Sequence, residues 1–64
     1  MDQNAARAIE ESIFRNRIVT ISYDATVEED LLALCDDSAD NAGVTEYWGT
    51  TPDGHTWCVN LARE

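Results

Sequence analysis

The sequence predicts a small α+β protein with one domain, residues 1–64, and the element order α-β-α-β-β. Three observations support this. Two stretches carry apolar residues at helical spacing, three others are rich in β-branched or aromatic residues, and a strong turn signal separates the last two. We therefore expect a three-stranded antiparallel sheet with two helices packed on one face and the last strand in the middle. A chain of this length buries only about 60 % of its unfolded surface, so no deep pocket is expected.

The first helix is predicted over residues 3–16. Its apolar residues recur at helical spacing: Ala5, Ala6, Ile9, Ile13 and Phe14. Most residues between them are helix formers, and either Asp2 or Asn4 is a candidate N-cap. β-branched and aromatic residues then run from residue 18 to residue 23 and predict a strand. We expect its buried face to consist of Val19, Ile21 and Tyr23.

The second helix is predicted to begin after Thr26, because Thr26 and Glu29 match the capping-box pattern. It is expected to stop at Gly43 in the left-handed conformation. At about 100° per residue, one side of this helix is mostly apolar. That side consists of Val27, Leu31, Leu34, Cys35 and Ser38. The opposite side is acidic and consists of Glu29, Asp36 and Asp40, with Asp30 and Asp37 beside them.

The last third of the chain predicts a hairpin around the turn Pro52-Asp53-Gly54. The final strand alternates, with an apolar face made of Trp57, Val59 and Leu61. On its partner strand we expect Val44, Glu46 and Trp48 to face one way, and Thr45 and Tyr47 to face the other.

The chain is strongly acidic, with a formal net charge of −9 from 13 acids and four bases, all of them arginine. Three of the arginines precede residue 18 and the fourth is Arg63. Such a charge repels nucleic acid and anionic membranes, and it attracts basic partners in a salt-dependent way. Without a spanning apolar run or a secretion signal, we expect a cytoplasmic protein. Its cysteines, Cys35 and Cys58, are then reduced thiols, although their pairing stays open.

No arrangement of residues predicts catalysis or a cofactor. His55 lies beside the hairpin turn, and Cys58, three residues later on a strand, points to the opposite face. The segment beginning at Asp36 is rich in oxygen ligands. An EF-hand loop starting there has Asn41 at its glycine position and Tyr47 at its glutamate position, so no metal site is expected. We therefore expect a protein that is not an enzyme.

The acidic residues carry the functional prediction. Acids in a first helical turn gain from the helix dipole, whereas Asp36, Asp37 and Asp40 are opposed by it, by about 0.3–1 kcal/mol each. No base lies three or four residues away to compensate. Asp36 and Asp40 are about 6 Å apart along a helix axis, close to two phosphate steps of about 3.4 Å. The predicted partner-binding surface is Asp24, Glu28, Glu29, Asp30, Asp36, Asp37, Asp40 and Glu46.

In size and acidity the chain resembles the anti-CRISPR inhibitors and related anti-defence proteins of phages, several of which are DNA mimics. The acids from Glu28 to Glu46 carry the resemblance. It implies a stoichiometric inhibitor in the host cytoplasm. Its acidic face would block the basic DNA-binding channel of a nucleic-acid-binding complex such as a CRISPR–Cas surveillance complex, without a cofactor and without binding nucleic acid itself.

Two alternatives stay open. Acid-rich chains without lysine also resemble halophile proteins, in which acidity is an adaptation to salt and acids spread over every surface. The other alternative is a small adaptor or regulatory protein that acts as a homodimer. Its interface would be aromatic, because Tyr47, Trp48 and Trp57 all lie on the predicted hairpin.

Overall fold

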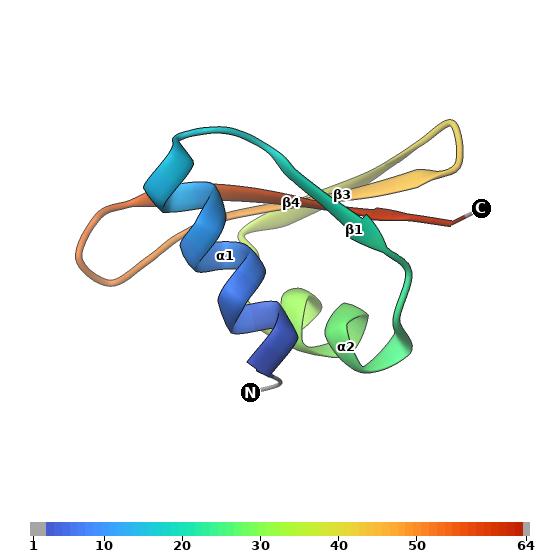
Figure 1. Ribbon diagram of the computed structural model, residues 1–64, viewed down its shortest axis with the longest axis horizontal. Coiled ribbons are helices and arrows are strands. Elements are labelled where there is room, and N and C mark those ends of the chain that lie inside the picture. The colour runs from blue at the N-terminus through green and yellow to red at the C-terminus, as the bar shows by residue number, and fades with distance from the viewer. Residues whose placement is uncertain (1–2, 64) are drawn as a thin grey trace.

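The computed structural model describes residues 3–63 (Figure 1). The elements, in chain order, are α1 (Gln3–Arg15), β1 (Val19–Ser22), α2 (Ala25–Leu34), β2 (Asp37–Asn41), β3 (Val44–Thr50) and β4 (Thr56–Ala62). The first helix is confirmed within one residue at its end. Of its two candidate N-caps, Asn4 lies inside α1, and Asp2 lies outside the described residues.

The α+β class with two helices is confirmed, but the three-stranded antiparallel sheet is wrong. The sheet has four strands in the order β1-β4-β3-β2. The last strand does lie beside β1, but the two are parallel, with Val19 opposite Val59, while the other two pairs are antiparallel. The reason is β2: this additional strand reverses the chain once more, so that β4 runs in the direction of β1.

The second helix is shorter than predicted because the chain leaves the helix after Leu34. Cys35 is the C-cap and is already extended, with φ −74° and ψ 154°. The N–H of Asp36 donates to the carbonyl of Trp48 at 2.8 Å, which begins the pairing of the next segment with β3. Asp37 and Asp40 therefore lie on an edge strand rather than on a helix. Gly43 has the expected positive φ, 84°, but with Ala42 at φ 50° it forms the two-residue turn between β2 and β3.

The start of α2 also differs from the prediction, because Asp24 rather than Thr26 is the N-cap. The Asp24 carboxylate accepts hydrogen bonds from the N–H groups of Thr26 and Val27, at 2.9 and 3.2 Å. Both residue types are good N-caps, so tertiary contacts decide between them. The N–H of Tyr23 still bonds to β4, through the carbonyl of Ala62, and the helix begins as soon as this contact ends. Tyr23 itself lies beyond β1 with its side chain 43 % exposed, so its predicted burial is wrong.

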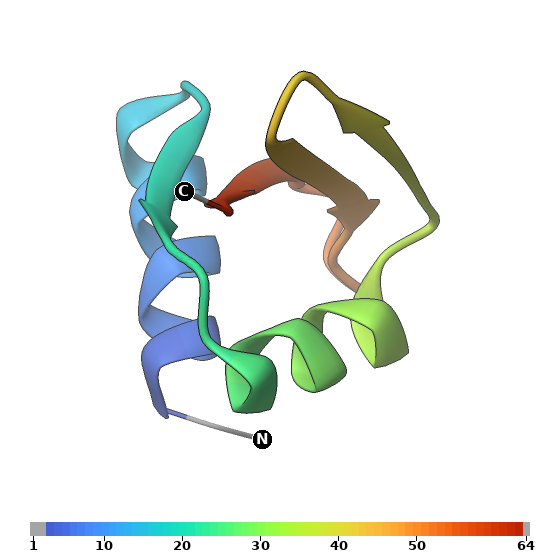
Figure 2. The ribbon, with the colours of Figure 1, turned by 90° about the vertical axis from the view of Figure 1, so that its right-hand side faces the viewer.

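The predicted hairpin of β3 and β4 and its alternation are confirmed. The face that looks toward the helices, the inner face, carries Tyr47, Trp57, Val59 and Leu61. These pack against residues of both helices: Ala5, Ala8 and Ile9 of α1, and Val27 and Leu31 of α2. Figure 2 shows both helices on this side of the sheet, α1 near β1 and α2 below, with the β2–β3 hairpin on the far side from α1. The opposite, outer face has no element over it among the described residues.

Gly49 makes room for the largest side chain of this core. It lies opposite Trp57 in the ladder, and a Cβ at residue 49 would come within 2.8 Å of the Trp57 ring. The indole therefore packs flat across the glycine backbone and is only 4 % exposed. Burying large side chains of this kind contributes about 1.5–3 kcal/mol each, which is substantial for so short a chain.

Ser12 of α1 extends the β1–β4 ladder by one step. Its hydroxyl donates to the carbonyl of Arg17 at 2.9 Å and accepts from the N–H of Cys58 at 2.9 Å. In the parallel register, the N–H of Cys58 would otherwise be placed to bond the carbonyl of Arg17 directly. Ser12 is only 3 % exposed, so water does not replace these bonds. Its hydroxyl satisfies two backbone groups and connects α1 to β4 and to the segment before β1.

We predict that Ser12→Ala lowers the free energy of unfolding by about 1–3 kcal/mol, because it leaves these two backbone groups without a partner. The matched control is Ser22→Ala, an exposed serine of β1, which should change stability by no more than about 0.5 kcal/mol. Urea unfolding followed by tryptophan fluorescence measures both. Equal stabilities of the two variants would contradict the bridging role.

Candidate functional site

The structure separates the eight acids of the predicted binding surface into three groups. Asp24 caps α2, and Glu28 accepts hydrogen bonds from distant residues, so these two have structural roles. Glu29 and Asp30 stay on α2. Asp36, Asp37 and Glu46 come together around β2 and β3, with Asp40 on the same edge strand. The single helical stripe of Glu29, Asp36 and Asp40 does not exist, because α2 ends at Leu34.

Glu28 is the centre of a polar cluster at one end of the core. One carboxylate oxygen accepts from the hydroxyl of Tyr23 at 2.8 Å. The other accepts from the hydroxyl of Tyr47 at 3.2 Å and from Nη2 of Arg63 at 2.8 Å. The side chain of Glu28 is 23 % exposed, so its charge is partly removed from water. The ion pair and the two tyrosine hydroxyls stabilise the charge, and Glu28 is not available as a binding residue.

Arg63 links this cluster to the edge of the sheet. Its Nε donates to the hydroxyl of Thr45 at 2.8 Å, and that hydroxyl donates to Asp40 at 2.8 Å. The guanidinium also lies 5.3 Å from the centre of the Tyr23 ring, which is the geometry of a cation–π contact. The spacing of these residues along the chain does not predict the cluster, because Arg63 and Glu28 are 35 positions apart. The one available signal is that Arg63 is the single base after residue 17.

The acids around β2 and β3 form what we call the acidic edge: Asp36, Asp37, Asp40 and Glu46. Asp37 lies opposite Trp48, and Glu46 lies opposite Ala39, so Asp37 and Glu46 are diagonal neighbours on the outer face, about 7–8 Å apart. No ion pair with another described residue neutralises any of these four. The extended chain separates Asp36 and Asp40 by about 13 Å, not the 6 Å of a helix.

Acids on an edge strand also have a structural effect. The outer side of β2 presents unpaired backbone groups, and charged side chains there discourage pairing with another strand. This accounts for Asp37 and Asp40. It does not account for Asp36, which precedes the strand, or for Glu46, which lies on β3.

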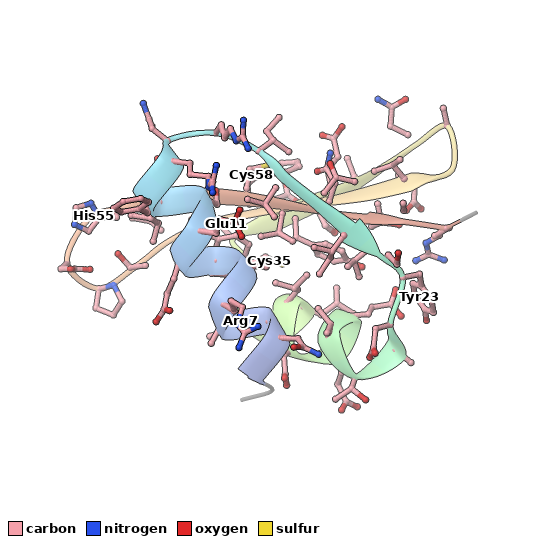
Figure 3. The ribbon with its side chains drawn as sticks, viewed as in Figure 1. Arg7, Glu11, Tyr23, Cys35, His55 and Cys58 are labelled. Atoms are coloured by element: carbon pink, nitrogen blue, oxygen red, sulfur yellow. The ribbon has the colours of Figure 1, made fainter. Side chains whose placement is uncertain are left out.

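The histidine and the two cysteines, the candidates for catalysis, lie in different parts of the molecule. His55 is in the exposed β3–β4 loop, with Nε2 3.7 Å from the Asp53 carboxylate, at the opposite end of the molecule from Tyr23 (Figure 3). Cys58 lies on the outer face, where burial and then the charge of Glu46 raise the pKa of its thiol, so that it stays protonated. Cys35 packs against the core on the other side of the sheet, and both thiols are free.

The three hairpin aromatics of the predicted dimer interface do not lie on one surface. Tyr47 and Trp57 are core residues, and Trp48 is 37 % exposed on the outer face.

Within residues 3–63 no group of acids, histidines or cysteines has the arrangement of a metal site. No helix in this range is long and apolar enough to cross a membrane.

Comparison of the chain with protein-family models, with curated proteins and with solved structures finds no match.

We predict that Glu28→Gln lowers the free energy of unfolding by about 1–3 kcal/mol. The amide loses the ion pair with Arg63 and places N–H donors where the tyrosine hydroxyls also donate. The control is Glu29→Gln, the same substitution at the next position, where the side chain is exposed. Chemical unfolding should show a change of no more than about 0.5 kcal/mol for the control. A similar loss in both variants would mean that the cluster does not stabilise the fold.

The cluster also predicts how stability responds to alkaline pH. Burial, then the charge of Glu28 and the hydrogen bond to it, raise the pKa of Tyr47 above its ordinary value. A raised pKa means that folding favours the neutral phenol. This contribution is complete below about pH 10 and is lost as the pH rises through the folded-state pKa.

Wild-type stability should therefore fall above pH 10 more steeply than that of Tyr47→Phe, by up to about 1.4 kcal/mol per pH unit. Unfolding curves measured between neutral pH and pH 11 test this difference. Parallel profiles for the two proteins would show that Tyr47 does not titrate in this way.

Proposed function

We propose that this protein is a stoichiometric inhibitor that presents an acidic surface to a basic nucleic-acid-binding channel and so acts as a DNA mimic. The candidate target is a CRISPR–Cas surveillance complex in the cytoplasm of a host cell, as the resemblance to phage anti-CRISPR proteins implies. The contact surface is the acidic edge together with Glu29 of α2. This surface is smaller than the one that the sequence predicts. Asp24 and Glu28 serve the fold, and Asp30 is a half-buried residue of α2 that has an interaction partner within the chain.

The observation that carries the proposal is the uneven placement of charge. The acidic edge has no ion-pair partner among the described residues, whereas Arg7, Arg15 and Arg17 all belong to α1 or the turn that follows it. Figure 2 places α1 and the β2–β3 hairpin on opposite sides of the molecule. An uneven field of this kind orients a protein toward a basic partner and speeds their encounter. Acidity that serves only salt adaptation would not need this concentration.

The strand geometry suits a phosphate mimic, although in a different way from a helix. Asp36 and Asp40 are about 13 Å apart on an extended chain, which is close to four phosphate steps of about 3.4 Å. Asp37 lies between them along the chain, and Glu46 adds charge on the neighbouring strand. Asp37 and Glu46 lie together on the outer face, and Asp40 lies on the other face beside Thr45. Carboxylates spread along a short hairpin in this way can replace a stretch of backbone phosphates on a Lys/Arg surface.

A competition assay tests the proposal. Labelled duplex DNA is bound to the surveillance complex, and the protein is titrated in while the bound label is measured. We expect wild type to displace DNA at stoichiometric amounts, less well as salt is raised. The double variant Asp36→Asn with Asp37→Asn should need about tenfold more protein, since it loses two charges from the contact.

The control is Glu10→Gln with Glu11→Gln, which changes the net charge by the same amount on α1. It should inhibit as wild type does. Equal weakening of both double variants would indicate that net charge rather than the acidic edge acts. Inhibition by the Asp36 and Asp37 variant at wild-type potency, or inhibition independent of salt, would contradict the mimic.

A further inference from the structure

The two edges of the sheet are protected to different degrees. The β2 edge carries Asp37 and Asp40 and ends in a tight turn. The β1 edge, residues 18–22, has no charged residue, no proline and no glycine. In Figure 1, β1 is the strand nearest the viewer, and no other element passes in front of it. Unprotected edges of this kind are templates for pairing with another strand.

The backbone groups that face this edge follow from the ladder. The N–H of Tyr23 donates to the carbonyl of Ala62, so Tyr23, Ile21 and Val19 direct their backbone groups toward β4. Because successive residues of a strand alternate in this direction, Thr20 and Ser22 direct their N–H and C=O groups outward. Ile18, next to β1, continues the same alternation.

We infer that two copies of this chain associate through β1, with the strands antiparallel about a two-fold axis at Thr20, to form one eight-stranded sheet. In this register Thr20 faces Thr20 of the second copy, and Ile18 faces Ser22. Each of these pairs exchanges two backbone hydrogen bonds, about six in all, and every outward-facing group from residue 18 to residue 22 is satisfied. A two-fold interface requires a self-complementary segment, and this segment is self-complementary.

The side chains fit the same register. Val19 and Ile21, which are half-buried at the margin of the core, pair with Ile21 and Val19 of the second copy on the inner face. On the outer face, Ile18 of one copy is 56 % exposed and comes to lie beside Ser22 of the other. Ser22, Ala62 and Val44 form one row across the sheet there and line a groove of about 550 Å³. The exposed isoleucine thus meets a mostly apolar hollow.

The charge distribution permits this association despite the net charge of −9. The acidic edges lie at the opposite ends of the two sheets, so that seven strand spacings, about 34 Å, separate them in the dimer. This is about four times the screening length of about 8 Å at physiological salt. Since the contact is a single short strand, we expect a weak interface, with a dissociation constant on the order of micromolar.

Sedimentation equilibrium of the full chain, from micromolar to millimolar concentration, tests the inference. Wild type should show a reversible monomer–dimer equilibrium. Thr20→Lys places two like charges opposite each other on the two-fold axis, so the dissociation constant should rise about tenfold or more. Thr56→Lys is the control, because it adds the same charge to an exposed threonine of β4 and should leave the constant unchanged.

Mixing Thr20→Lys with Thr20→Glu supplies a second test that does not depend on the stability of either variant. Opposite charges at the axis should restore association, and only as a heterodimer. A wild-type chain that stays monomeric at millimolar concentration would overturn the inference. So would a dimer that Thr20→Lys leaves intact, since its interface would then lie elsewhere.

Discussion

The carboxylate of Glu28 joins the start of α2 to three separate parts of the sheet. It receives hydrogen bonds from Tyr23 after β1, Tyr47 of β3 and Arg63 after β4. Because Glu28 lies in the first turn of α2, these bonds fix where the helix starts against the sheet, and the helix dipole favours the charge there. The position of α2 then determines where the chain returns, and so where β2 pairs with β3. Glu28 therefore stabilises the fold from within, although the chain is very acidic. Its charge does not belong to the surface that a partner could contact.

The surface that is left has two unlike edges. One is acidic, which discourages pairing with another strand, and the other carries no charge that would do so. A dimer joined at the neutral edge would display two acidic edges facing outward, about 34 Å apart. An inhibitor with two such surfaces could engage two basic sites at once, and the second contact would then gain from the high effective concentration that the first creates. The two proposals are independent in their evidence, but together they describe a bivalent molecule.

Local patterns predicted the elements whose formation is local. The spacing of Ala5, Ile9 and Ile13 identified α1, and Pro52-Asp53-Gly54 identified the β3–β4 turn. The segment 37–41 has little strand propensity of its own and pairs because β3 offers an open side, which no local pattern records. The helix dipole opposes Asp36, Asp37 and Asp40 in a last turn, which is a reason for the helix to stop at Leu34, but the charge pattern alone does not say where the chain goes next. The partners of Glu28 come from distant positions, so its role could not be recognised from spacing.

The parallel pairing of β1 with β4 has a kinetic consequence. β2, β3 and β4 follow one another through short turns, so their contacts close small loops and can form early. Val19 contacts Val59 only when a loop of 40 residues (59 − 19) closes. The chain loses the entropy of this closure before the contact contributes any stability. We expect the transition state for folding to contain the three-stranded meander with β1 still undocked. Late in folding, therefore, the chain passes through a state in which the edge of β4 is uncovered, and misassembly between chains would begin from that state.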